Sequence, residues 1–292
     1  RFAGEHNCKF TATAHHFDDQ IETDENGQPI LPKPVFDYFT AQLPACFMSL
    51  IGPNASGKST FMLLAAGKVK PNQGSVKLLD KDFAALTPQQ ADALCSFVYQ
   101  NMEFENDDKV ASLLEYVFAN GYHKKPSPFA DLKKAPVDAG FYNDVIKVFE
   151  LSKVLDKKLT GISKGEIQRV LLAFSVLYGA HSIFMDEPMF AMEENQKHSA
   201  LEFLRDYSKK QNVPVCMAMH ELDLSRKYAE NVLLFYPDRR MDFGTPEEVL
   251  TTDALQDSYG VPAAMLRDSE ALNRQSLKEA SETLQSIINT EK

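Results

Sequence analysis

The chain has 292 residues, with 41 acidic against 31 basic side chains and a formal net charge of −10. Nucleic-acid-binding proteins usually present a basic surface, because phosphate contacts supply much of their affinity, so this balance argues against that class. The longest mostly apolar run, residues 170–180, is shorter than the roughly 20 residues of a membrane-spanning helix. The four cysteines lie far apart and lack the spacing of a zinc or iron–sulfur site, which fits a reducing compartment.

Strands dominate the predicted elements of the first hundred residues. The acidic, turn-rich stretch at 18–33 is predicted to be an exposed insertion between two of them. A short apolar strand ends at Gly52, and a helical pattern starts at Lys58. The strands are predicted at residues 9–15, 35–40, 45–51, 78–79 and 97–99.

The second part of the chain alternates helices with buried strands. Residues 101–163 show helical apolar stripes, and the runs at 181–185 and 213–219 have the continuous apolar pattern of parallel strands. Residues from 263 onward carry apolar side chains at the spacing of one amphipathic helix. Alternating strands and helices predict an α/β sandwich, and the helical middle predicts an inserted subdomain.

Residues 52–60, GPNASGKST, match the phosphate-loop pattern G-x-x-x-x-G-K-[ST]. Two glycines let the backbone curl and aim its amides at phosphate oxygens. Lys58 is expected to reach the β- and γ-phosphates, and the Ser59 hydroxyl is expected to bind Mg²⁺. The predicted nucleotide-binding residues are Gly52, Pro53, Asn54, Ala55, Ser56, Gly57, Lys58, Ser59 and Thr60.

Two adjacent carboxylates, Asp186 and Glu187, end the apolar run HSIFMDEP. Open α/β sheets bind their ligands at the carboxyl ends of strands, so both side chains are expected beside the phosphate loop. Asp186 would hold Mg²⁺, and Glu187 would orient and polarise the attacking water, because phosphoryl transfer mainly needs positioning and charge stabilisation. Alone, this motif is an ordinary strand exit; beside a phosphate loop it predicts ATP hydrolysis.

Over roughly residues 8–262 the sequence resembles the nucleotide-binding subunit of ABC transporters. Residues 162–170, ISKGEIQRV, are similar to the family signature LSGGQ/E-x-Q-R. In the family, this segment caps the γ-phosphate of ATP bound to the opposite subunit, so the resemblance implies a head-to-tail dimer in which Ser163, Gly165 and Glu166 contact the nucleotide. Lys164 stands in place of a glycine, and Ile162 in place of a leucine.

The resemblance assigns several further residues. Gln100 takes the Q-loop position, where it would sense Mg²⁺ and the attacking water, and His220 matches the switch histidine that contacts the γ-phosphate. The D-loop, SALD in most relatives, is here FAME at 190–193. Phe17, with His16 second, is the candidate aromatic that would stack on adenine.

The fold that the resemblance implies is that of a P-loop NTPase of the ABC ATPase type. It has a three-layer α/β core, an N-terminal antiparallel β region and an inserted helical subdomain at about 101–163. We expect this ABC ATPase domain to occupy residues 1–262, acidic insertion included, and residues 263–292 to form a C-terminal helical extension.

The resemblance is strongest for the ATPase subunits of importers for iron–siderophore complexes, haem or cobalamin, because the ending GTPEEVLTTDALQDSYGVP is similar to theirs. It implies ATP and Mg²⁺ as cofactors and a peripheral place on the cytoplasmic face of the membrane. Implied partners are a second ATPase subunit, a transmembrane permease and, indirectly, a substrate-binding protein, with no nucleic acid.

Three alternatives stay open: a soluble ABC ATPase acting on ribosomes or DNA, a transporter subunit for another substrate class, and a non-hydrolysing binding module. Ribosome-associated relatives usually carry two cassettes, and DNA-repair relatives carry long coiled coils, whereas this sequence shows one cassette with a short helical middle. The complete set of hydrolytic residues opposes the non-hydrolysing module.

Overall fold

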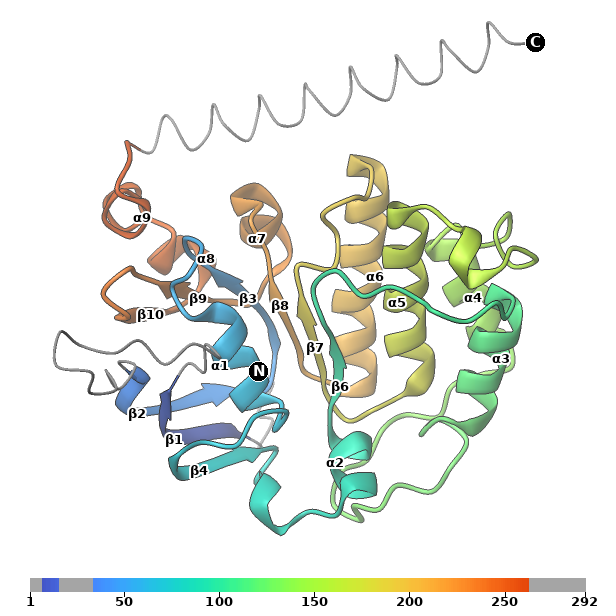
Figure 1. The fold of residues 1–292 in the computed structure, drawn as a ribbon, viewed down its shortest axis with the longest axis horizontal. Helices are drawn as coiled ribbons and strands as arrows, with labels where there is room; N and C mark the ends of the chain where they lie inside the picture. The colour runs from blue at the N-terminus through green and yellow to red at the C-terminus, as the bar shows by residue number, and fades with distance from the viewer. Residues whose placement is uncertain (1–6, 16–33, 263–292) are drawn as a thin grey trace, which may run out of the picture.

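The computed structural model describes residues 7–15 and 34–262, which form two β-sheets and a set of helices (Figure 1). The predicted acidic insertion at 18–33 and the predicted tail helix from 263 lie outside the described residues. Among the residues that are described, no helix combines the length and the apolar character needed to cross a bilayer.

The smaller sheet has the strand order β2-β1-β4-β5 and is antiparallel. Strand β1 (Asn7–His15) lies between β2 (Pro34–Pro44) and β4 (Gln73–Leu78), and β5 (Lys81–Asp82) forms one edge. The predicted N-terminal antiparallel region is therefore present, and the strand expected at 35–40 continues to Pro44.

The larger sheet has the order β10-β9-β3-β8-β7-β6. All of its neighbouring pairs are parallel except β9 with β10, which is an antiparallel edge strand. Because the parallel strands share a direction, their carboxyl ends meet at one edge of the sheet. The bounds are β3 Phe47–Ile51, β6 Ser96–Val98, β7 Ile183–Asp186, β8 Val215–Ala218, β9 Asn231–Phe235 and β10 Met241–Gly244.

Helices cover both faces of this sheet, as Figure 1 shows. Helix α1 lies between the two sheets, and α3 to α6 lie on the opposite side. The α-helices are α1 Lys58–Ala65, α2 Pro88–Leu94, α3 Val110–Asn120, α4 Phe141–Val148, α5 Lys164–Tyr178, α6 Glu194–Gln211, α7 Leu222–Tyr228, α8 Pro246–Val249 and α9 Thr252–Tyr259.

Strand β3 explains the layering, because successive side chains of a strand point to opposite faces. Met48 and Leu50 pack in the core with α1 and the small sheet, whereas Phe47 and Ile51 pack in the core with α5 and α6. Burying both faces accounts for the uninterrupted apolar run. The α/β core predicted from the sequence is confirmed, with the phosphate loop between its central strand and an enclosed helix.

The middle of the chain contains the helices α3 and α4, as the helical pattern of 101–163 predicts. Leu114 and Val117 of α3 and Val145 of α4 are buried in the same core cluster as α5. These helices sit on the outer side of α5 and α6 (Figure 1). Residues 124–138 between them include no helix or strand.

Candidate functional site

The phosphate loop connects β3 to α1 and is closed on itself by its lysine. Lys58 Nζ donates hydrogen bonds to the carbonyls of Gly52 and Pro53, both at 2.8 Å. Gly57 has φ of 102°, and a Cβ there would lie 3.2 Å from the side chains of Val35 and Phe36. A glycine is therefore required where the loop turns into the helix. The amino end of α1 then faces the loop, which favours an anion there.

Two residues of the loop carry features that a bound phosphate would explain. Ala55 has φ of 60°, a left-handed conformation that is costly for any residue with a Cβ. The hydroxyl of Ser56 is buried and lacks a hydrogen-bond partner among the described residues. A buried polar atom without a partner costs free energy, so a ligand that bonds to it would be favoured.

Three strand ends bring the predicted hydrolytic side chains together. Glu187 follows β7, Gln100 comes shortly after the neighbouring β6, and His220 shortly after β8 on the other side. Gln100 Nε2 donates to Glu187 Oε2 at 2.8 Å, and His220 Nε2 donates to Glu187 Oε1 at 2.6 Å. Both carboxylate oxygens thus have a fixed partner. Glu187 has φ of 48°, so its backbone turns sharply where the strand ends.

The titratable groups at this edge influence one another. The hydrogen bond from His220 lowers the pKa of Glu187, and the same bond raises the pKa of His220. Burial raises the pKa of Asp186, opposed by a hydrogen bond with the Ser59 hydroxyl. Burial lowers the pKa of Lys58, opposed by the nearby carboxylates. The site therefore combines one anchored carboxylate, one buried carboxylate and one buried cation.

An open cleft of about 760 Å³ brings these elements to solvent. That volume lies within the range of small-molecule sites. The structure adds two residues that the sequence patterns did not indicate, Val35 of β2 and Arg239 from the turn between β9 and β10. Phe190 of the segment that corresponds to the D-loop also lines the cleft. The predicted residues that line it are Asn54, Ala55, Gly57, Lys58, Ser59, Thr60, Gln100, Glu187 and His220.

The donors available for a magnesium ion are oxygen atoms. Ser59 and Asp186 already share a hydrogen bond, so a hydroxyl and a carboxylate converge beside the phosphate loop. Hard oxygen donors of this kind, completed by substrate phosphates, are what Mg²⁺ prefers. Among the side chains that the structure describes, no three His, Cys, Asp or Glu residues gather into a metal cluster. The donor set fits an ion that binds together with a nucleotide.

The segment similar to the family signature is not part of this cleft lining. Ser163 caps α5: its hydroxyl accepts from Glu166 N, and Glu166 accepts from Ser163 N at 2.7 Å. Lys164, which replaces the glycine of the family pattern, is exposed to solvent. Ile162, which replaces the leucine, is buried in the core. The three predicted contacts Ser163, Gly165 and Glu166 thus lie together at the amino end of α5.

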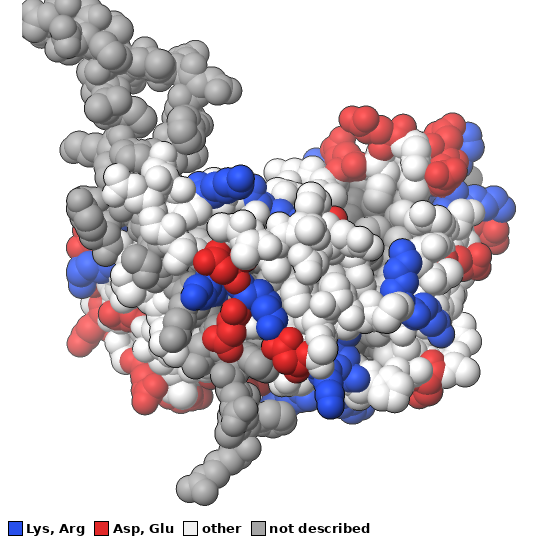
Figure 2. Space-filling model, turned by 90° about the horizontal axis from the view of Figure 1, so that it is seen from below, with Lys and Arg blue, Asp and Glu red and all other residues white. Residues whose placement is uncertain are grey.

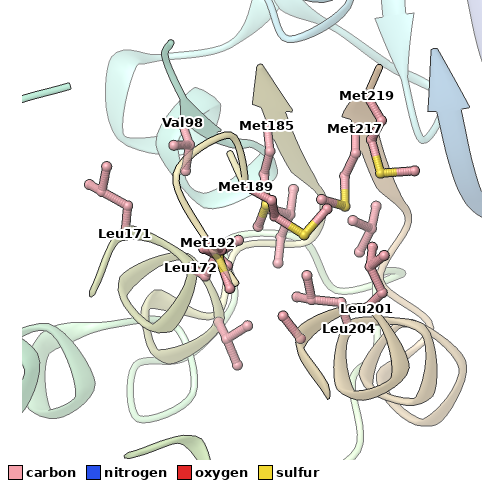
Figure 3. Close-up of a cluster of buried hydrophobic side chains, with 14 of the residues drawn as sticks. Val98, Leu171, Leu172, Met185, Met189, Met192, Leu201, Leu204, Met217 and Met219 are labelled. Atoms are coloured by element: carbon pink, nitrogen blue, oxygen red, sulfur yellow. The ribbon is translucent and has the colours of Figure 1, made fainter. Parts of the chain in front are cut away.

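The residues corresponding to the D-loop divide between core and surface. Met192 and the preceding Met189 are buried among residues of β7, β8, α5 and α6, as Figure 3 shows. Phe190 is 74% exposed at the cleft. Ala191 N donates to Gln168 Oε1 at 2.7 Å, so the loop is tied to α5. The two unusual side chains of this loop therefore differ in role: Met192 anchors the loop in the core, and Phe190 projects from it.

Phe17 and His16, the candidates for stacking on adenine, lie outside the described residues. The backbone of β1, which precedes them, pairs with both β2 and β4.

The chain matches the model of the ABC transporter family over residues 44–190. It is 29% identical over 222 residues to a cobalamin import ATP-binding protein of Halobacterium salinarum, covering 76% of this chain and 54% of that one. A hemin import ATP-binding protein of Thermobifida fusca is 26% identical, covering 73% of this chain and 72% of that one. The chain thus spans about half the length of the first relative and more of the second.

A solved ATP-binding subunit of an ABC transporter has the same fold, with a TM-score of 0.66 at 16% identity over 90% of this chain and 98% of that one. The family match includes the phosphate loop, Gln100, the segment at 162–170 and both carboxylates. The chain belongs to the ABC transporter family.

Proposed function

We propose that the chain is the ATP-hydrolysing motor subunit of an ABC importer of the iron–siderophore, haem or cobalamin type. The observation that carries this proposal is the anchored carboxylate of Glu187, held between Gln100 and His220 across a nucleotide-sized cleft from Lys58. A module that only binds nucleotide has no need for a carboxylate fixed in this way.

The phosphate loop and Lys58 bind the triphosphate. Ser59, Asp186 and the amide oxygen of Gln100 would hold Mg²⁺, which would supply charge neutralisation for the triphosphate. Glu187 orients a water molecule for attack on the γ-phosphate and accepts its proton, since its lowered pKa keeps it ionised. His220 holds Glu187 in place and contacts the γ-phosphate.

A second subunit completes the site. Ser163, Gly165 and Glu166 lie apart from the cleft of their own chain, at a helix amino end that suits an anion. We infer that they cap the nucleotide of another copy in a head-to-tail dimer, which ATP favours and hydrolysis releases. The other partners we propose are a permease and, through it, a substrate-binding protein, which places the chain on the inner face of the membrane.

The domain limits follow the same reasoning. We propose that the ATPase domain spans 1–262 with the helical subdomain at about 101–163, and that 263–292 is an extension. Helices α3 and α4 and their shared core with α5 support the subdomain.

The names of both curated relatives support an importer of metal–tetrapyrrole compounds. Figure 2 shows acidic side chains interspersed with basic ones on the face that it displays, an arrangement that suits a protein partner better than a nucleic acid. Affinity capture from solubilised membranes would test the point. A polytopic membrane protein is expected, and recovery of ribosomes or DNA instead would contradict the importer.

The activity itself is tested with Lys58→Ala, because Lys58 is the buried cation of the cleft. We expect the loss of measurable binding of a fluorescent ATP analogue and of ATP turnover. Lys68→Ala is the matched control, since Lys68 follows the other end of α1 and only approaches Asp92 at 3.8 Å. Equal effects of the two substitutions would contradict the proposed phosphate site.

A further inference from the structure

A largely buried ion pair includes the residue that follows His220, the predicted switch histidine. Lys197 of α6 and Glu221, the residue after His220, are joined by a contact of 2.5 Å between Nζ and Oε1. The side chains are 8% and 23% exposed. Burying two charges is costly, and proteins that keep such a pair often use it to fix a conformation.

Glu221 is also held through its main chain. Its carbonyl accepts hydrogen bonds from Ser225 N and Ser225 Oγ, both at 3.1 Å. Ser225 shares a buried 2.8 Å hydrogen bond with Ser49 of β3, the strand that leads into the phosphate loop. Glu221 is therefore fixed to the central strand through its backbone and to α6 through its carboxylate.

Lys197 lies one helical turn from the D-loop segment 190–193. Its backbone N–H donates to the carbonyl of Glu193 at 3.0 Å, and Glu193 is the N-cap of α6. Ala191 lies two residues before Glu193, and its N–H is hydrogen-bonded to Gln168 of α5. The carbonyl oxygen of Ala191 is so close to Gly165 that a Cβ on Gly165 would lie 2.6 Å from it. Contacts thus run without a break from the amino end of α5 to Lys197.

We propose that the Lys197–Glu221 pair is a positioning device that holds His220 against Glu187 and ties it to the segment 190–193. This inference rests on the proposed function and adds two residues to it. The pair acts through His220, because neither Lys197 nor Glu221 lines the cleft. Through this contact between Lys197 and Glu221, the position of the Glu187 carboxylate depends on the segment 190–193 at the start of α6.

The test is a double-mutant cycle on the full chain. Lys197→Met with Glu221→Gln removes both charges together, so that no unpaired charge stays buried. We expect kcat for ATP hydrolysis to fall about tenfold with KM within about twofold, because misplacing a catalytic group mainly affects the chemical step. When His220 is already replaced by Ala, the same two substitutions should change kcat by less than about twofold. The ion pair acts through His220, and the effects of coupled residues are not additive.

Lys209→Met is the matched control. Lys209 lies in the same helix and approaches Glu230 at 3.9 Å, but its side chain is 43% exposed and is not among those that line the cleft. It should leave kcat and KM unchanged. An equal loss of kcat with and without His220 would overturn the positioning role, as would unchanged kcat in the neutral pair.

A second measurement does not depend on turnover. The His220 Cε1–Hε1 signal in NMR, identified by its loss in His220→Ala, should move in the neutral pair and stay in place in Lys209→Met. An unmoved signal in both would refute the proposal even if the protein hydrolyses ATP. Absence of ATP binding and hydrolysis in the unaltered chain would instead contradict the proposed function, and the NMR signal would still decide the role of the pair.

Discussion

The replacement of Glu187 by Gln separates the chemistry of the site from its stability. Glu187 accepts one hydrogen bond from Gln100 and one from His220. A glutamine keeps the shape of the side chain, and its amide can still bond to both neighbours if its oxygen faces Gln100 and its NH₂ faces a neutral imidazole. The substitution therefore removes the negative charge and the proton acceptor with little change in packing.

The two expected magnitudes differ widely. Exchanging a charge-assisted hydrogen bond for a neutral one costs about 1 kcal/mol. Because the His220 side chain is 40% exposed, solvent screening should reduce that cost to about 0.5 kcal/mol. Loss of a general base lowers kcat by about 10²- to 10⁴-fold, which is about 3 to 5 kcal/mol of the activation barrier. Activity should consequently collapse in a protein that is almost as stable as before.

The stability cost should also depend on pH. The lowered pKa of Glu187 gives stability that is present above its ordinary value of 4.5 and is lost as pH falls. The raised pKa of His220 gives stability that is present below its ordinary value of 6.5 and is lost as pH rises through the folded-state pKa. The difference in unfolding free energy between Glu187→Gln and the unaltered chain is thus expected to be largest between the two ordinary values, 4.5 and 6.5. It should shrink as pH falls through the folded-state pKa of Glu187 and shrink in part as pH rises through the folded-state pKa of His220.

Steady-state ATP turnover and denaturant unfolding at several pH values would measure both effects. Glu194→Gln is the matched control, since Glu194 also approaches a histidine, His198, at 3.5 Å but on the exposed side of α6. That control should retain full turnover. The reasoning would be refuted by Glu187→Gln turnover within about threefold of the unaltered chain. Size-exclusion chromatography with ATP adds a further check: trapped nucleotide should accumulate dimer, and a strictly monomeric variant would count against the shared site.

Two further substitutions address the loops. Ala55→Gly should raise the free energy of unfolding by up to about 1 kcal/mol. The substitution removes the strain of a left-handed alanine, and this gain exceeds the cost of the greater conformational freedom that glycine has in the unfolded chain. Thermal melts that show destabilisation would contradict this. Gly165→Ala should reduce turnover while leaving ATP binding intact, because its Cβ would lie 2.6 Å from the Ala191 carbonyl and move the start of α5; unchanged turnover in the folded variant would be inconsistent with that contact.

The sequence was most informative where chemistry is local. The phosphate loop occupies nine consecutive residues, from the end of β3 into the first turn of α1, so the pattern alone located it. Gln100, Glu187 and His220 are far apart in the chain, yet each follows an apolar strand. Glu187 was expected at this edge because its strand ends there, whereas Gln100 and His220 were assigned by the resemblance to the ABC family. Parallel strands end at one edge, which is why the three side chains meet.

Other features depend on which elements become neighbours, which spacing does not reveal. Arg239 lines the cleft because the antiparallel edge strand β10 returns beside β9, and the sequence analysis predicted neither strand. Lys197 meets Glu221 because α6 packs against α7, and the sequence positions of the two residues do not predict this contact. Such contacts follow only from the assembled fold.

The segment 189–193 shows how unusual side chains can be accommodated in the α/β core. Met189 and Met192 fill the space between the ends of β7 and β8 and the helices α5 and α6 (Figure 3). Methionine suits such an irregular gap, because its side chain is flexible and unbranched. Met189 and Met192 are buried and Ala191 N is bonded to Gln168, so Phe190 is exposed on a firmly held loop. An aromatic ring on a firmly held loop at the rim of the cleft loses little conformational entropy when a surface covers it, so Phe190 is suited to contribute to the head-to-tail dimer that we propose.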